Sequence, residues 1–198
     1  MRAFLVLLVL AGFGGTAAAA EISSEYTDLA TEKDCVTYDR AVDGEGDWAE
    51  LACDGYRGYP VMISYGDARE SILYGFPPEN NFVWESFTGF NSSGPKIEWR
   101  IEKDGDKAVP FATIHRWFVS AGDDGAKQVE VLVVERVAQP RDKQGCAVGY
   151  VVATGNPKAN EAARKIADER AKTFSCGVDE PIQMDGAVPV PGFSRDQS

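Results

Sequence analysis

The stretch GCAVGYVVATGNPKANEAARKIADERAKTFSCG, residues 145–177, sets a short apolar run beside the longest helical pattern of the chain, with a cysteine near each end. The run AVGYVVA, residues 147–153, is typical of a buried strand. Asn156 is a good N-cap, and Pro157 suits the first position of a helix. We therefore expect a strand followed by one helix that packs against a sheet.

The expected helix has an alanine-rich face, which allows it to lie close to the sheet. This stripe consists of Ala159, Ala163, Ile166, Ala167, Arg170 and Phe174. Glu161 with Lys165, and Asp168 with Lys172, are spaced as i,i+4 pairs on the opposite face. That face is expected to be solvated.

Four cysteines occur in the chain, namely Cys35, Cys53, Cys146 and Cys176. An even number in an exported protein is typical of disulfides. Three pairings are possible, and we predict Cys35–Cys53 and Cys146–Cys176, because each pair is near in sequence and flanks local structure. A redox pair and a zinc site are the alternatives. The chain lacks the C-x-x-C spacing that redox motifs and most zinc sites use.

Most of the remaining sequence has the pattern of short strands. CVTYDR and WAELAC can form one hairpin, and VPFATIHRWFVS with QVEVLVVERVA a second. In KIEWRIEK, Ile97, Trp99 and Ile101 alternate with charged residues, which is the pattern of a half-buried strand. We predict an α+β, mostly β fold: an antiparallel sandwich or rolled sheet of about eight strands with one C-terminal helix.

The N-terminus has the order of a secretory signal peptide. Arg2 is followed by the apolar run AFLVLLVLAGFGG and by small residues that suit cleavage after Ala20. The expected organisation is a signal peptide at residues 1–20, one disulfide-stapled β-rich domain at 21–177, and a Pro/Gly-rich, mostly extended or disordered tail at 178–198. The apolar run is too short to span a membrane comfortably. A periplasmic or secreted protein with no membrane span after cleavage is expected.

The chain is acidic, with 20 basic and 31 acidic residues and a net charge of −11. A negative surface repels phosphate backbones, so nucleic-acid binding is not expected. The acidity itself is ordinarily a matter of solubility and identifies no cationic partner.

An aromatic region is the most suggestive candidate for ligand binding. It centres on Trp84, with Tyr56, Arg57 and Tyr59 of the motif GYRGYP nearby. Aromatic faces with a flanking arginine can hold a sugar or a peptide. The competing interpretation is that most of these rings fill the core of the β domain.

Catalytic and metal motifs are weak in this sequence. His115 is the only histidine, and no G-x-S-x-G motif is present, so a buried structural histidine is the favoured interpretation. The acidic stretch DGEGDWAELACD does not fit the EF-hand pattern, because Trp48 stands where the loop requires glycine. We predict no catalytic residue, no metal site and no cofactor.

The motifs CAVGYVVA, NPKANEAARKIAD and FSCG resemble the corresponding segments of uncharacterised secreted proteins of alpha-proteobacteria. The resemblance covers about a third of the chain, from Gly145 to Pro181. It implies a Gram-negative periplasmic setting and carries no activity and no functional residue.

Three hypotheses for function follow. The first is an exported, periplasmic, non-catalytic protein that binds a small ligand, a glycan or an envelope protein. The second is a hydrolase acting on an envelope polymer, which requires a carboxylate pair or His115 in a cleft. The third is a structural or assembly protein of the cell envelope, whose contacts are made by the helix or the tail.

Overall fold

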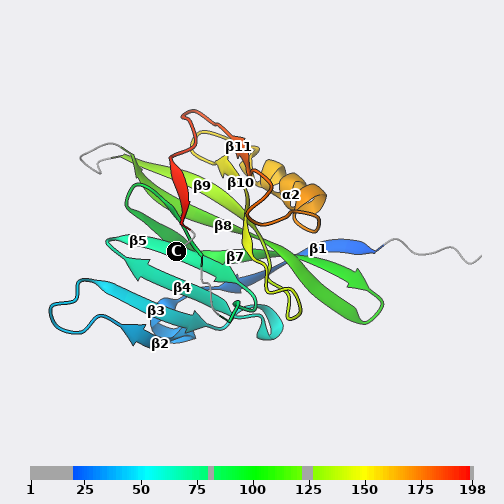
Figure 1. Cartoon of the computed structure of the whole chain (residues 1–198). Coiled ribbons are helices and arrows are strands. Elements are labelled where there is room, and N and C mark those ends of the chain that lie inside the picture. Colours follow the sequence, from blue (N-terminus) through cyan, green and yellow to red (C-terminus); the bar gives the residue numbers. More distant parts are fainter. Residues whose placement is uncertain (1–19, 80–82, 122–126, 197–198) are drawn as a thin grey trace, which may run out of the picture.

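The protein is built in three layers, as Figure 1 shows: helix α2 (Ala159–Arg170), a six-stranded sheet and a four-stranded sheet. The computed structural model describes residues 20–79, 83–121 and 127–196. The expected signal peptide, except for Ala20, lies outside the described residues. So do residues 122–126, the turn of the second predicted hairpin. The predicted fold class, mostly β with one main helix, is confirmed.

The six-stranded sheet has the order β1-β7-β8-β9-β10-β11. Its strands are β1 (Glu21–Asp28), β7 (Asn91–Asp104), β8 (Lys107–Ala121), β9 (Lys127–Arg136), β10 (Cys146–Val152) and β11 (Ile182–Met184). The four-stranded sheet has the order β2-β3-β4-β5, comprising β2 (Cys35–Arg40), β3 (Trp48–Cys53), β4 (Val61–Gly66) and β5 (Arg69–Tyr74). A two-stranded ribbon pairs β6 (Trp84–Phe87) with β12 (Phe193–Asp196). Two short helical turns are α1 (Thr31–Asp34) and η1 (Tyr56–Gly58).

The larger core lies between the two main sheets. Side chains that alternate along β7 and β9 enter it from one side, and β4 and β5 supply the other side. Ile97, Trp99 and Ile101 are fully buried here, as their alternation predicts. Both predicted hairpins form: β2 pairs with β3, and β8 pairs with β9.

The smaller core lies between α2 and the opposite face of the six-stranded sheet. Ala159, Ala163, Ile166 and Ala167 form the buried face of the helix. Gly149 of β10 allows the close approach, because a Cβ at that position would lie 3.0 Å from the Ile166 side chain. The helix begins later than the N-cap signal suggests, because Asn156 caps a preceding turn by accepting from the Lys158 amide.

Two charged side chains of β7, Glu98 and Arg100, do not face solvent as the alternation suggests, because α2 covers them. Glu98 and Arg100 are 7% and 8% exposed. Arg164 donates to Glu98 at 2.7 and 3.0 Å, and Arg100 donates to both carboxylate oxygens of Asp168 at 2.8 and 2.7 Å. Burial raises the pKa of Glu98, but the hydrogen bonds from Arg164 and Ser24 and the neighbouring arginine charges outweigh it and leave that pKa lowered. These ion pairs fix the helix on the sheet.

Both predicted disulfides are present. Cys35 and Cys53 stand directly opposite each other in the β2–β3 pair. Cys146 begins β10, and Cys176 follows α2, so this bond ties the chain beyond the helix to the sheet. Two intramolecular disulfides are typical of proteins that fold in an oxidising compartment.

The structure contains more strands than the sequence indicates: twelve within the described residues rather than about eight. Three of the additional strands are β1, β11 and β12. Each lies at the edge of its sheet or ribbon. Their sequences are mixed in polarity, so they carry no clear alternation. Two of these strands lie in the Pro/Gly-rich tail: β11 runs parallel to β10, and β12 pairs with β6. The tail is therefore packed on the domain.

His115 links the two sheets from the centre of the larger core. Its ring is fully buried, with Nδ1 2.6 Å from the Tyr74 hydroxyl and Nε2 2.6 Å from the Gly94 carbonyl oxygen. A carbonyl can only accept, so Nε2 carries the proton and Nδ1 accepts from Tyr74. Burial lowers the pKa of His115 to about 4, and the hydrogen bond to Gly94 opposes that shift only in part. The ring is therefore a neutral structural group.

The neutrality of His115 predicts an acid-sensitive fold. In the unfolded chain His115 is protonated below its ordinary pKa of 6.5, whereas in the folded chain it is protonated only below about pH 4. The free energy of unfolding should therefore fall by about 3 kcal/mol from this group across that window. Urea unfolding between pH 7.5 and 4.5 should show that the wild type loses more stability than His115→Gln, which does not titrate. A constant difference between the two proteins across that range would contradict this account.

Candidate functional site

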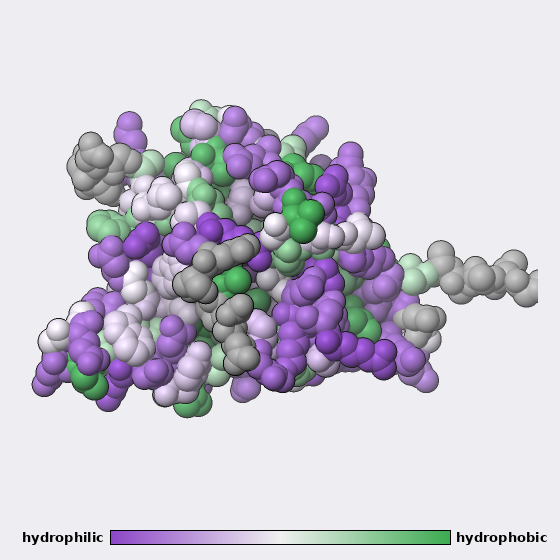
Figure 2. Space-filling view, viewed as in Figure 1, coloured by the Kyte–Doolittle hydropathy of each residue, from purple (hydrophilic) through white to green (hydrophobic). Residues whose placement is uncertain are grey.

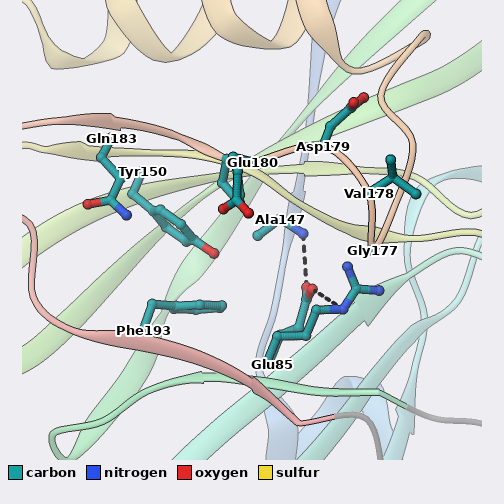
Figure 3. A pocket seen from close by; sticks show the side chains of 11 residues that line it. Glu85, Ala147, Tyr150, Gly177, Val178, Asp179, Glu180, Gln183 and Phe193 are labelled. Carbon is teal, nitrogen blue, oxygen red and sulfur yellow. Dashed lines mark hydrogen bonds and ion pairs between the residues drawn. The ribbon is translucent and has the colours of Figure 1, made fainter.

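A cavity of about 280 Å³ lies where the C-terminal segment crosses the end of the six-stranded sheet (Figure 3). Its floor consists of Glu85 from β6, Ala147 and Tyr150 from β10, and Phe193 and Arg195 from β12. Its roof is the segment 177–181 with Gln183 of β11. Strands from three distant parts of the chain thus meet at one place. The volume is close to the lower limit of about 300 Å³ for typical ligand pockets.

Tyr150 presents the most informative polar group of this cavity. The residue is 2% exposed, and its ring lies 4.5 Å from that of Phe193 and 6.0 Å from that of Phe87. Figure 3 shows its hydroxyl directed toward the space between Glu85 and Glu180. No described residue forms a hydrogen bond with this hydroxyl. Burial and the nearby charge of Glu85 raise the pKa of Tyr150, so the phenol keeps its proton.

Glu85 is held at the base of the cavity by two partners. Its Oε2 accepts a hydrogen bond of 2.9 Å from the Ala147 amide, and its Oε1 lies 3.2 Å from Arg195 Nε in an ion pair. Burial raises the pKa of Glu85, whereas the Ala147 amide and the Arg195 charge lower it. Burial is the largest of these effects, so the pKa of Glu85 is raised overall, and the two partners offset only part of that rise.

Glu135 is a second buried carboxyl close to this group. It stands opposite Ala147 in the β9–β10 pair and is 4% exposed. No hydrogen bond from a described residue reaches its carboxyl group. Burial and the negative charge of Glu85 raise the pKa of Glu135 well above its ordinary value of 4.5. Glu135 is therefore the protonated member of the pair, and it does not line the cavity.

The Cys146–Cys176 disulfide frames the cavity. Cys146 immediately precedes Ala147 in the floor, and Cys176 immediately precedes Gly177 in the roof. Asp179 stabilises the roof further, because its side chain accepts a hydrogen bond of 2.8 Å from the Ser175 amide. The roof is therefore tied to the sheet at the point where it begins.

The structure separates the four residues that the sequence suggests for ligand binding. Arg57 and Tyr59 line an open depression near η1. Tyr56 is 7% exposed and packs against Trp99 in the core, with ring centroids 6.1 Å apart. Trp84 lies in β6 beside Asp196 and belongs to neither that depression nor the cavity beneath the roof.

The residues of the cavity were not singled out by the sequence. Glu85 follows Trp84 in a stretch dominated by aromatic residues, and Arg195 lies in the tail. One signal was present: Glu135 interrupts the apolar run VLVVERVA, and a charged residue in a buried strand marks a place that needs a partner. The sequence did not indicate which partner.

Figure 2 shows that hydrophilic residues cover most of one face of the molecule, with apolar residues scattered between them. Within the described residues, no three acidic, histidine or cysteine side chains gather as they would to hold a metal ion. None of the helices in the described part of the chain is long and apolar enough to cross a membrane. No protein-family model, no curated protein and no solved structure matches the chain.

The burial of Glu135 predicts a stabilising substitution. Above pH 4.5 the unfolded carboxyl loses a proton that the folded one retains, so this group costs more stability as the pH rises. Glu135→Gln should therefore raise the melting temperature at pH 7, by about 2 to 4 °C per kcal/mol recovered, and leave it nearly unchanged at pH 4. Differential scanning calorimetry at both pH values measures this.

The matched control is Glu169→Gln, because Glu169 is exposed on α2. It should change the melting temperature at neither pH. A Glu135→Gln protein that is less stable than the wild type at pH 7 would show that the carboxyl is satisfied in the folded state.

Proposed function

We propose that this chain is an exported, non-catalytic binding protein of the cell envelope, and that a small ligand occupies the cavity beneath segment 177–181. The observation that carries the proposal is the Tyr150 hydroxyl, which is directed into the cavity without a hydrogen-bond partner among the described residues. The hydroxyl is reachable from the cavity, because it is not one of the fully buried side-chain atoms that lack a partner in the described part of the chain. A ligand that completes this bond would gain affinity without a rearrangement of the site.

The surrounding groups support binding of a polar molecule. Arg195 Nε lies 3.2 Å from Glu85 Oε1, and no hydrogen bond from the two terminal guanidinium nitrogens of Arg195 occurs within the described residues, so they can meet other partners. Gln183 adds an amide to the same wall. A few polar groups that converge on a partly apolar wall are typical of small-molecule sites.

The proposed compartment rests on the two disulfides and on the signal-peptide pattern. Disulfides persist in oxidising compartments such as the bacterial periplasm. A periplasmic protein is exposed to small molecules that pass through the outer envelope, which agrees with a binding role.

The hydrolase alternative gains one element, two neighbouring carboxyl groups, Glu85 and Glu135, whose pKa values are both raised by burial. Such pairs are a common basis for acid and base catalysis. Only Glu85 lines the cavity, however, and Glu135 lies behind it. His115 is buried between the sheets and is fully used by Tyr74 and Gly94. The binding role is therefore preferred.

A thermal-shift screen tests the proposal with a panel of neutral sugars, amino acids, alkyl amines and short peptides. A compound at about 100 times its Kd stabilises the protein by about 2.7 kcal/mol, which raises the melting temperature by several degrees. At least one class should do so with the wild type. The shift should fall sharply in Tyr150→Phe and persist in Tyr38→Phe, whose ring is exposed on β2.

Arg57→Ala belongs in the same screen because it addresses the depression near η1. A shift that is lost in Arg57→Ala and kept in Tyr150→Phe would place the ligand at the aromatic region instead. A panel without any effect on the wild type would contradict the binding role itself.

A further inference from the structure

We infer that the cavity beneath segment 177–181 binds an ammonium group carried on a short carbon chain, either as a free alkyl amine or as the side chain of lysine. This inference rests on the proposed function, since it names the ligand class of the same site. Its support comes from the position of the Tyr150 hydroxyl and from the charges around it.

The Tyr150 hydroxyl is directed toward a space bordered by Glu85 and Glu180 (Figure 3). The residue is 2% exposed, so the protein holds this phenol rigidly. An ammonium group has three donors and no acceptor. Placed in that space, it can donate to the phenol oxygen and to the two carboxylates at once, which satisfies all three donors.

The charge of the lining also favours a cation. Three acidic residues, Glu85, Asp179 and Glu180, and one basic residue, Arg195, line the cavity. Arg195 already pairs with Glu85, whereas no ion pair within the described part of the chain involves Glu180. Glu180 is exposed at the rim, so it can meet an incoming ligand first.

An organic cation fits this lining better than a metal ion. Calcium and magnesium prefer several carboxylate, carbonyl or water oxygens around one point. Here the Tyr150 phenol and the Phe193 ring occupy the wall, and the volume of about 280 Å³ exceeds what one ion requires. The edge of the Phe193 ring offers apolar contact to a carbon chain. Hydrogen-bond donors on one end and methylene groups on the other describe an alkyl ammonium ion.

Three probes of the same shape test the charge preference: n-butylamine, 1-butanol and butyrate, titrated at constant ionic strength at pH 7 into ¹⁵N-labelled protein. The amide signals of residues 177–185 report binding. Butylamine should bind at least 10-fold more tightly than butanol, because hydrogen bonds to charged groups are roughly twice as strong as neutral ones. Butyrate should not bind. A lysine-containing tripeptide then distinguishes a side-chain ligand from a free amine.

Variants locate the probe. Glu180→Gln and Tyr150→Phe should each weaken butylamine binding about 10-fold or more. Glu169→Gln, which removes one carboxylate from the exposed face of α2, should leave it unchanged.

The outcomes separate the ligand class from the site. Equal or tighter binding of butanol or butyrate, sensitive to Tyr150→Phe, would overturn the ammonium preference and keep the cavity as the site. Tighter binding of calcium chloride to the same signals would do the same in favour of a metal ion. Signals that move elsewhere, or that ignore Tyr150→Phe, would overturn both the inference and the proposed function.

Discussion

The six-stranded sheet is covered on both faces, and this double coverage governs the rest of the structure. Along β9, Val131 and Val133 enter the core shared with the four-stranded sheet, while Leu132 and Val134 enter the core beneath α2. Strands buried on both faces are ordinarily apolar throughout. Every polar side chain on the central strands must therefore find its partner inside the protein or pay a desolvation cost.

The buried acidic and basic side chains of the six-stranded sheet meet that requirement to different degrees. Glu98 and Arg100 form ion pairs with Arg164 and Asp168 of α2. These pairs fix the position of the helix on the sheet. His115 is satisfied by the Tyr74 hydroxyl from the facing sheet and by the Gly94 carbonyl from the adjacent strand β7. Glu135 keeps its proton and lacks such partners among the described residues. The least satisfied group thus lies beside the cavity, where β6 and β12 close the end of the sheet.

The sequence predicts well whatever depends on neighbours in the chain. Both disulfides, both hairpins and the single main helix follow from spacing, alternation and composition. The edge strands β1, β11 and β12 were missed because their pairing depends on where a distant strand ends rather than on their own pattern. Likewise, burial of Tyr56 could not be read from its motif, since an aromatic ring suits a core and a binding surface equally well.

The cavity could not be predicted from the sequence, because its lining residues come from separate segments of the chain. Glu85, Tyr150 and Arg195 are far apart in the chain and meet only after the C-terminal segment has returned to β6. The Cys146–Cys176 bond makes that meeting reproducible. The bond joins residues with a sequence separation of 30. On the chain-entropy model, closing such a loop stabilises the folded state by roughly 3.5 kcal/mol. Cys146 and Cys176 also stand next to the floor and the roof of the cavity. The disulfide that ties the chain beyond the helix to the sheet therefore also fixes the geometry in which a ligand would meet Tyr150.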